Sequence, residues 1–143
     1  MKIRKMVMTD LPAIISLADQ LGYKCSHENL IERFKEFNQE NSALFVGEIS
    51  NTVMAFMQIQ ENLTLMSGKR AEINAVVIDE QFRGKGYGKR MMETAEEWVI
   101  ERGLPKLRLG SRTSRTDTHE FYKKCGFGVE KTWFVFSKSV LEK

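Results

Sequence analysis

The sequence predicts an α+β (mixed α/β) fold, and two features of the chain indicate this class. Three β-rich runs follow one another before strands begin to alternate with helices, which disfavours a uniformly wound parallel sheet. A buried-type strand also leads directly into a glycine-rich loop and then into a helical pattern. The length of 143 residues suits one hydrophobic core, so we expect a single domain over residues 1–143.

The first part of the chain predicts one strand and two helices. Residues 2–7 alternate weakly and favour a strand. Thr9 or Asp10 can cap a helix that Gly22 ends. Ser26 can cap a second helix, whose apolar face comprises Leu30, Ile31, Phe34 and Phe37.

The middle of the chain predicts three strands. Residues 43–49 and 52–60 are β-rich and are separated by Ser50 and Asn51, a pattern typical of a hairpin. Residues 71–78 form a third such run, directly before the glycine-rich loop.

The remainder alternates between helix and strand. The predicted helix after the loop has one apolar face, made by Met91, Met92, Ala95, Trp98 and Val99. Gly103 closes this helix, and residues 107–109 favour a short strand. Asp117, with Glu120 three positions on, predicts a capped short helix that Gly126 ends. Residues 128–138 are β-rich and predict a further strand.

The charge pattern favours a small anionic ligand. The net charge is +3, with 22 basic and 19 acidic residues, which is too balanced to indicate nucleic acid. Positive charge is concentrated in residues 83–90 and 102–115, and neither stretch contains an acidic residue. We therefore expect a local basic surface and no nucleic-acid partner.

Other compositional features predict location and exclude several kinds of site. No apolar run reaches the roughly 20 residues of a membrane span, and the N-terminus lacks a secretory pattern, so we expect a cytoplasmic protein without a membrane partner. Cys25 and Cys125 do not make a disulfide framework. His27 and His119 lack metal-ligand spacing, so we expect no metal.

The glycine-rich loop has the composition of a phosphate-binding site. Glycines at 84, 86 and 88 let the backbone approach a ligand, and the following helix start offers N–H groups and a positive dipole end. The loop matches neither the dinucleotide-binding nor the P-loop glycine pattern. A turn that only reverses the chain is the alternative interpretation.

Two motifs resemble those of the GCN5-related N-acetyltransferase (GNAT) family. Arg83-x-x-Gly86-x-Gly88 is similar to the family's coenzyme A pyrophosphate signature, and Phe121–Phe127 (FYKKCGF) resembles its F-Y-x-x-x-G-F segment. The resemblance covers nearly the whole chain. It implies a GNAT-like fold with a central mixed sheet of six to seven strands, about four helices, and a splay between the fourth and fifth strands.

The resemblance implies acetyl-CoA as co-substrate and identifies residues that would bind it. In the family, the backbone before the loop bonds the pantetheine arm, although these positions also suit plain core strand residues. Arg115 stands where relatives often carry an asparagine, and we expect it to contact the cofactor. The implied binding residues are Val76, Val77, Ile78, Arg83, Gly84, Lys85, Gly86, Tyr87, Gly88, Lys89 and Arg115.

The resemblance to the GNAT family also implies two catalytic residues, identified by their positions relative to the two motifs. Tyr122 aligns with the family tyrosine that protonates the departing thiolate, a task for a weak acid. Glu72 stands eleven positions before Arg83, the first residue of the pyrophosphate signature. In the histone-acetylating branch of the family, the glutamate that acts as the base has the same spacing from that signature. A substrate-orienting or merely outward-facing role for Glu72 is the alternative, and His119 is expected to be structural.

The implied function is N-acetylation of a primary amine by direct transfer in a ternary complex. The alternatives are a non-catalytic acyl-CoA-binding module and a basic nucleic-acid-binding domain. The acceptor can be a small-molecule amine or an amine of a peptide or protein, and the sequence does not choose between them. Many relatives pair through sheet edges or terminal strands, so the resemblance also allows a homodimer.

Overall fold

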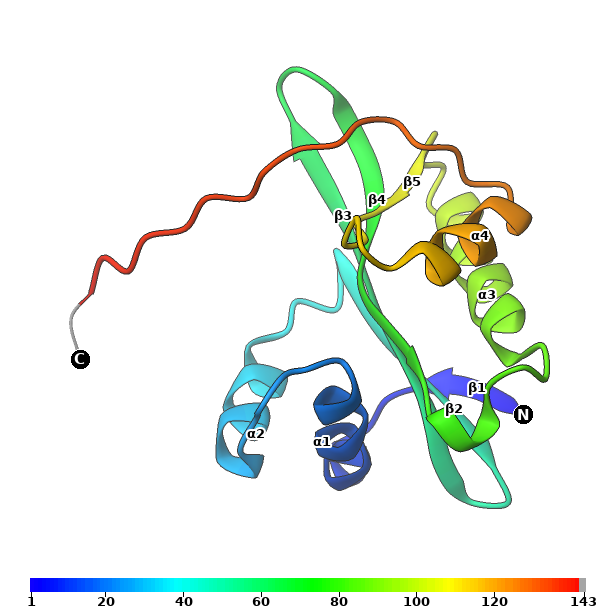
Figure 1. Cartoon of the computed structure of the whole chain (residues 1–143). Coiled ribbons are helices and arrows are strands. Elements are labelled where there is room, and N and C mark those ends of the chain that lie inside the picture. The colour runs from blue at the N-terminus through cyan, green and yellow to red at the C-terminus, as the bar shows by residue number, and fades with distance from the viewer. Residues whose placement is uncertain (142–143) are drawn as a thin grey trace. The chain divides into compact units, whose positions relative to one another are not determined.

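The structure is a computed structural model that describes residues 1–141 (Figure 1). The chain forms two compact units, one from Met1 to Gly110 and a second that begins at Ser111. The first contains the sheet and most helices, and the second contains one helix.

The first unit is built on a five-stranded sheet in which spatial order follows chain order. The strands are β1 (Lys2–Lys5), β2 (Ser42–Ile49), β3 (Thr52–Thr64), β4 (Gly68–Ile78) and β5 (Leu107–Leu109). Neighbours from β1 to β4 are antiparallel, whereas β4 and β5 are parallel. The predicted α+β class with a mixed sheet is therefore confirmed.

The β2–β3 hairpin turns at the predicted residues. Ser50 and Asn51 have φ values of 49° and 64°, the two consecutive positive angles that a tight type I′ turn requires. β3 and β4 are longer than the sequence predicted, because their ladder extends to the pair Thr64 and Gly68. Polar residues continue these strands because an antiparallel pair can leave one face in water.

The predicted strand at residues 128–138 is wrong, and the sheet has five strands among residues 1–141 instead of six to seven. The segment has β-forming side chains, and Trp133, Phe134, Val135 and Phe136 are exposed. β-propensity describes how well a side chain fits a paired, half-buried surface. Composition alone therefore did not decide whether this segment joins a ladder.

Helices lie on both sides of the sheet in the first unit, with α1 (Leu11–Gln20) and α2 (His27–Glu36) on one side and α3 (Tyr87–Glu101) on the other (Figure 1). Two short 3₁₀ helices, η1 (Met8–Asp10) and η2 (Glu80–Phe82), precede α1 and the glycine loop. The apolar cluster beneath α1 and α2 contains Met6, Leu11, Ile14, Leu17, Leu44, Val46 and Val77. The predicted apolar face of α3 is confirmed, since all five of its residues are buried.

One of the two predicted caps in this unit is confirmed. The Ser26 hydroxyl accepts a hydrogen bond from the Asn29 N–H at 3.1 Å and begins α2. Asp10 precedes α1, but its carboxylate makes no cap bond to that helix. It accepts instead from the Val7 N–H at 2.8 Å, so it closes the η1 turn.

The second unit contains α4 (Thr116–Lys124). The predicted cap at Asp117 is wrong, because the N-cap residue is Arg115 and Asp117 lies in the first turn. An acidic residue is still favourable there, since it faces the positive end of the helix dipole. Gly126, with φ of 95°, ends the helix as predicted.

Candidate functional site

The loop between β4 and α3 needs glycine at two positions. Gly84 and Gly86 have φ values of 78° and 86°, a region that other residues rarely adopt. No heavy atom lies within 4 Å of a Cβ placed on either residue. The backbone here is therefore open to a ligand, which is more than a turn that only reverses the chain requires.

The start of α3 is suited to bind an anion. Gly86 is the N-cap residue, no side chain caps the helix, and its first turn contains no acidic residue. The N–H groups of a first turn have no partner within the helix and carry the positive end of its dipole. Together with the open glycines, they fit a phosphate or diphosphate.

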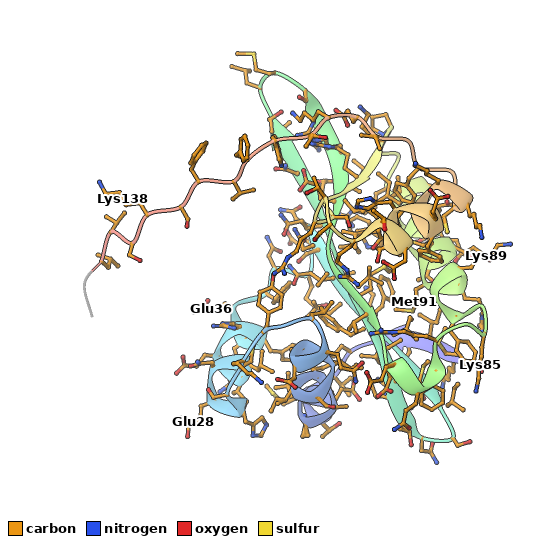
Figure 2. All side chains as sticks on the ribbon, in the orientation of Figure 1. Glu28, Glu36, Lys85, Lys89, Met91 and Lys138 are labelled. Atoms are coloured by element: carbon orange, nitrogen blue, oxygen red, sulfur yellow. The ribbon has the colours of Figure 1, made fainter. Side chains whose placement is uncertain are left out.

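Basic side chains surround this helix start. Arg83, Lys85 and Lys89 are exposed. In Figure 2, Lys85 and Lys89 extend away from the sheet, whereas Met91 points toward it. Arg83 Nε also donates to the Ile78 carbonyl oxygen at 3.0 Å, which ties the loop to the end of β4. Sequence reasoning did not identify this anchoring contact.

The β4 strand has one edge that is paired along only part of its length. β5 pairs with Ala71, Glu72 and Ile73 of β4, and within residues 1–141 no strand continues this ladder toward Ile78. On the other edge, Val76, Val77 and Ile78 pair with Met57, Phe56 and Ala55 of β3. The predicted pantetheine segment therefore combines a partly buried strand with a backbone edge beyond the reach of β5.

Glu72 lies in β4, between β3 and the edge strand β5, within a cluster of polar side chains. Its Oε1 accepts a hydrogen bond from Asn62 Nδ2 at 3.2 Å. The same oxygen lies 3.7 Å from Arg70 Nε and 3.5 Å from Arg108 Nη1. Glu72 is 28% exposed, so it is reachable from solvent while its partners limit its motion.

Sequence reasoning missed Asn62 and Arg70 as partners of Glu72, and it noted Arg108 only as part of a basic stretch. The alternation of β4 places residues 70 and 72 on one face. The register then adds Arg108, which stands opposite Glu72, and Asn62, which stands opposite Arg70. Strand alternation was available as a signal, but the register was not.

Tyr122 belongs to the second unit and packs within a small aromatic group. Its ring centroid lies 5.4 Å from that of Phe121 and 5.9 Å from that of Phe127. Burial raises the pKa of the Tyr122 phenol, while the positive charge of Arg115 opposes this rise. The phenol is therefore neutral at physiological pH, as a proton donor must be.

His119 has a structural contact in the second unit. Its Nε2 lies 2.8 Å from the Arg112 carbonyl oxygen, which joins α4 to the turn before it. The backbone N–H of His119 also donates to the Arg115 carbonyl oxygen at 3.2 Å. These contacts support the structural role that the sequence suggested.

A hollow of about 520 Å³ lies where α1 joins α2. Its lining comprises Ile15, Ser16, Asp19, Tyr23, Lys24, Cys25 and Ser26.

Among residues 1–141, no three metal-ligating side chains lie together. In the same range, no helix is long and apolar enough to cross a membrane.

Comparison with known proteins finds one family over most of the chain. The model of the acetyltransferase (GNAT) family matches residues 11–127. An uncharacterized N-acetyltransferase of Bacillus subtilis, YhdJ, is 30% identical over 126 residues, which cover 87% of each chain. Streptothricin acetyltransferase of Escherichia coli is 25% identical over 79% of this chain and 65% of its own length.

A solved structure shares both the fold and part of the sequence. Glucosamine-6-phosphate N-acetyltransferase of Arabidopsis thaliana superposes with a TM-score of 0.84 at 26% identity. The superposition covers 96% of this chain and 98% of the other. The fold therefore agrees over almost the full length of both proteins.

Proposed function

Because the chain belongs to the acetyltransferase (GNAT) family, we propose that it transfers an acetyl group from acetyl-CoA to a primary amine. The transfer is direct and occurs in a ternary complex. The observation that carries this proposal is the open, uncapped start of α3 behind Gly84 and Gly86. Family members generally take acetyl-CoA as co-substrate. The free N–H groups at the start of α3 and the open backbone at Gly84 and Gly86 are the groups that bind a diphosphate such as that of coenzyme A.

The family match also supports one functional domain. It extends from residue 11 to residue 127 and thus crosses the boundary at Gly110 between the two units. We therefore assign both units to a single acetyltransferase domain over residues 1–143.

In the proposed mechanism, the chain supplies binding along the loop and β4. Backbone N–H groups of Tyr87, Gly88 and Lys89 bind the diphosphate, and Arg83, Lys85, Lys89 and Arg115 add positive charge. The backbone of Val76, Val77 and Ile78 aligns the pantetheine arm. Acetyl-CoA supplies the acetyl group as a thioester. A strand N–H near Val77 or Ile78 polarises the carbonyl that the amine attacks.

Two side chains move protons in this mechanism. Glu72, directly or through a water molecule, takes a proton from the substrate ammonium, whose pKa is about 10 in a lysine-like amine. Tyr122 gives its phenolic proton to the departing thiolate, and the raised pKa of this phenol keeps the proton available. Most of the rate enhancement comes from holding the two substrates together.

The names of relatives support one class of acceptor. The names of two relatives specify streptothricin and glucosamine 6-phosphate, which are small molecules with amino groups. We propose a small-molecule amine as the acceptor of this chain as well.

The test is calorimetric titration with acetyl-CoA of the wild type and of Gly86→Glu. A suitable control is Gly68→Glu, because Gly68 also has a positive φ of 73° and open space around it, but lies at the tip of the β3–β4 hairpin. We expect micromolar binding in the wild type and control, and loss in Gly86→Glu. Wild-type protein that binds no acetyl-CoA would overturn the proposal. If the wild type binds acetyl-CoA, the next step is a screen of acceptor amines in which the free thiol of released coenzyme A is detected.

A further inference from the structure

The Glu72 carboxylate is held through one of its two oxygens. Asn62 Nδ2 donates a hydrogen bond to Oε1 at 3.2 Å. Two guanidinium groups approach the same oxygen most closely, with Arg70 Nε at 3.7 Å and Arg108 Nη1 at 3.5 Å. Within residues 1–141, no hydrogen bond reaches Oε2. One oxygen of this carboxylate is therefore surrounded by donors, while the other is open to a ligand.

The Asn62 contact is the one of the three that has the length of an ordinary hydrogen bond. N–H···O bonds in proteins span about 2.7–3.2 Å. Among residues 1–141, Arg70 Nε has no hydrogen-bond partner, and the Arg108 contact lies at 3.5 Å. A charge at such a distance attracts the carboxylate, but a hydrogen bond also has a preferred direction. Asn62 is thus the group that fixes how the carboxylate is turned.

Strand register brings Asn62 to Glu72. Asn62 of β3 stands opposite Arg70 of β4, so Glu72, two positions along β4, is its diagonal neighbour on the same face. Both Asn62 and Glu72 are half-buried. Ala71 and Ile73, which alternate with Glu72, are buried on the other face of the sheet. The backbone of two paired strands therefore holds the donor and the carboxylate at a set separation.

We propose that Asn62 is a positioning residue that acts through Glu72 and holds Oε1, so that Oε2 accepts the proton of the substrate ammonium. The inference rests on the proposed function, in which Glu72 is the base. A carboxylate oxygen offers about two lone-pair positions, and the donors around Oε1 cover that atom. Oε2 therefore faces the acceptor amine.

The proton follows a short path in this arrangement. As the N–H bond of the ammonium breaks, an O–H bond forms at Oε2, and the lone pair of the amine becomes free to attack the thioester carbonyl. The carboxylate becomes a neutral carboxyl group. It then releases the proton to solvent, which reaches Glu72 because this side chain is 28% exposed.

The test compares Asn62→Ala with the wild type in acetyl transfer to an amine. Alanine removes the donor and adds no bulk. We expect kcat to fall by about 10-fold, as for the loss of one hydrogen bond to a charged group. The KM for the amine and the calorimetric affinity for acetyl-CoA should be nearly unchanged. Asn62→Gln keeps an amide donor and should retain part of the lost rate.

Two further readouts separate positioning of a base from a merely structural role. The deficit of Asn62→Ala should shrink as the pH rises toward about 10, because free amine then forms in solution and needs no base. The deficit should also disappear in the Glu72→Gln background, since a residue that acts through Glu72 adds nothing once that base is absent. A structural deficit would persist at every pH and in both backgrounds.

Gln58→Ala is the matched control on the same face of β3. Gln58 Nε2 donates to Asn74 Oδ1 of β4 at 3.3 Å. This change therefore also removes one side-chain hydrogen bond between β3 and β4, but it leaves the contacts of Glu72 in place. We expect the kcat and the pH profile of this variant to match those of the wild type.

The outcomes separate this inference from the proposed function. Wild-type kcat in Asn62→Ala, or a deficit that is equal at every pH and in both backgrounds, would overturn the inference and leave the acetyltransferase function intact. An equal loss in Gln58→Ala would show general damage to the strand pair and would also overturn it. A wild type that binds acetyl-CoA but acetylates no amine would overturn both the inference and the proposed function.

Discussion

The guanidinium of Arg4 and the carboxylate of Asp10 form a two-pronged ion pair, with both N–H···O distances at 2.9 Å. Asp10 is 7% exposed and also accepts from the Val7 N–H, so it joins β1 to the turn before α1. Arg4 Nε additionally lies 3.3 Å from Glu48 Oε1 of β2. This pair holds the first strand and first helix together at the edge of the core.

Removing the Asp10 charge should destabilise the protein in a pH-dependent way. The Arg4 hydrogen bonds lower the pKa of Asp10 below its usual 3.8. Stability from this pair is therefore present above pH 3.8 and is lost as the pH falls through the lower, folded-state pKa. At pH 7 we expect Asp10→Asn to lower the melting temperature by roughly 5 °C. Thermal unfolding from pH 7 to pH 2 measures this, and an unchanged difference across that range would contradict the assignment.

Replacing Tyr122 by phenylalanine should separate binding from catalysis. Phenylalanine keeps the ring that packs against Phe121 and Phe127 but removes the proton donor. We expect kcat to fall by about 100-fold or more, as for loss of a general acid. Calorimetry should show unchanged affinity for acetyl-CoA. A variant with wild-type kcat would show that the thiolate takes its proton from elsewhere.

The ionisation of Tyr122 should appear only at high pH. Burial is the main cause of its raised pKa, and Cys125 adds to the rise. The difference in tyrosinate absorbance between wild type and Tyr122→Phe should therefore titrate above pH 10. Because the folded state keeps the proton longer than the unfolded state, stability from this group is lost as pH rises through the folded-state pKa.

An Arg115 variant checks whether the high-pH titration belongs to Tyr122. The positive charge of Arg115 favours the tyrosinate and lowers the pKa of Tyr122. We expect Arg115→Gln to move the Tyr122 titration to still higher pH. A shift to lower pH would mean that Arg115 does not act on this phenol through its charge.

Local sequence signals predicted much of the fold and the backbone of the glycine-rich loop. Glycine at a required positive φ, as at Gly86 and Gly126, and the helical spacing of Met91, Ala95 and Trp98 depend on neighbours within a few residues. The order of elements from β1 to α4 was therefore predictable. The family resemblance is confirmed by the match over residues 11–127.

Interactions between distant residues were not predictable in the same way. Asp10 was expected to cap α1, but the Arg4 guanidinium and the Val7 N–H compete for its carboxylate. Residues 128–138 form no strand, because pairing is a property of two segments. The Arg108 contact with Glu72 spans 36 positions and depends on strand register. The catalytic roles of Glu72 and Tyr122 remain predictions.

Replacing Glu72 by glutamine should reveal whether it takes a proton or only orients the amine. Loss of a general base lowers kcat by about 100-fold or more at neutral pH. If Glu72 is the base, the variant should recover rate as pH rises toward about 10, because the free amine then forms in solution. Its pH–rate profile should thus be steeper than that of the wild type.

The matched control for this variant is Glu61→Gln, which alters the ion pair between Glu61 of β3 and Arg102, the residue that follows α3. We expect it to lower stability slightly and to leave the pH–rate profile unchanged. If Glu72→Gln lowers kcat/KM by the same factor at every pH, proton removal does not depend on Glu72. The carboxylate would then act by orienting the ammonium between Arg70 and Arg108, and a water molecule or the bulk solvent would accept the proton.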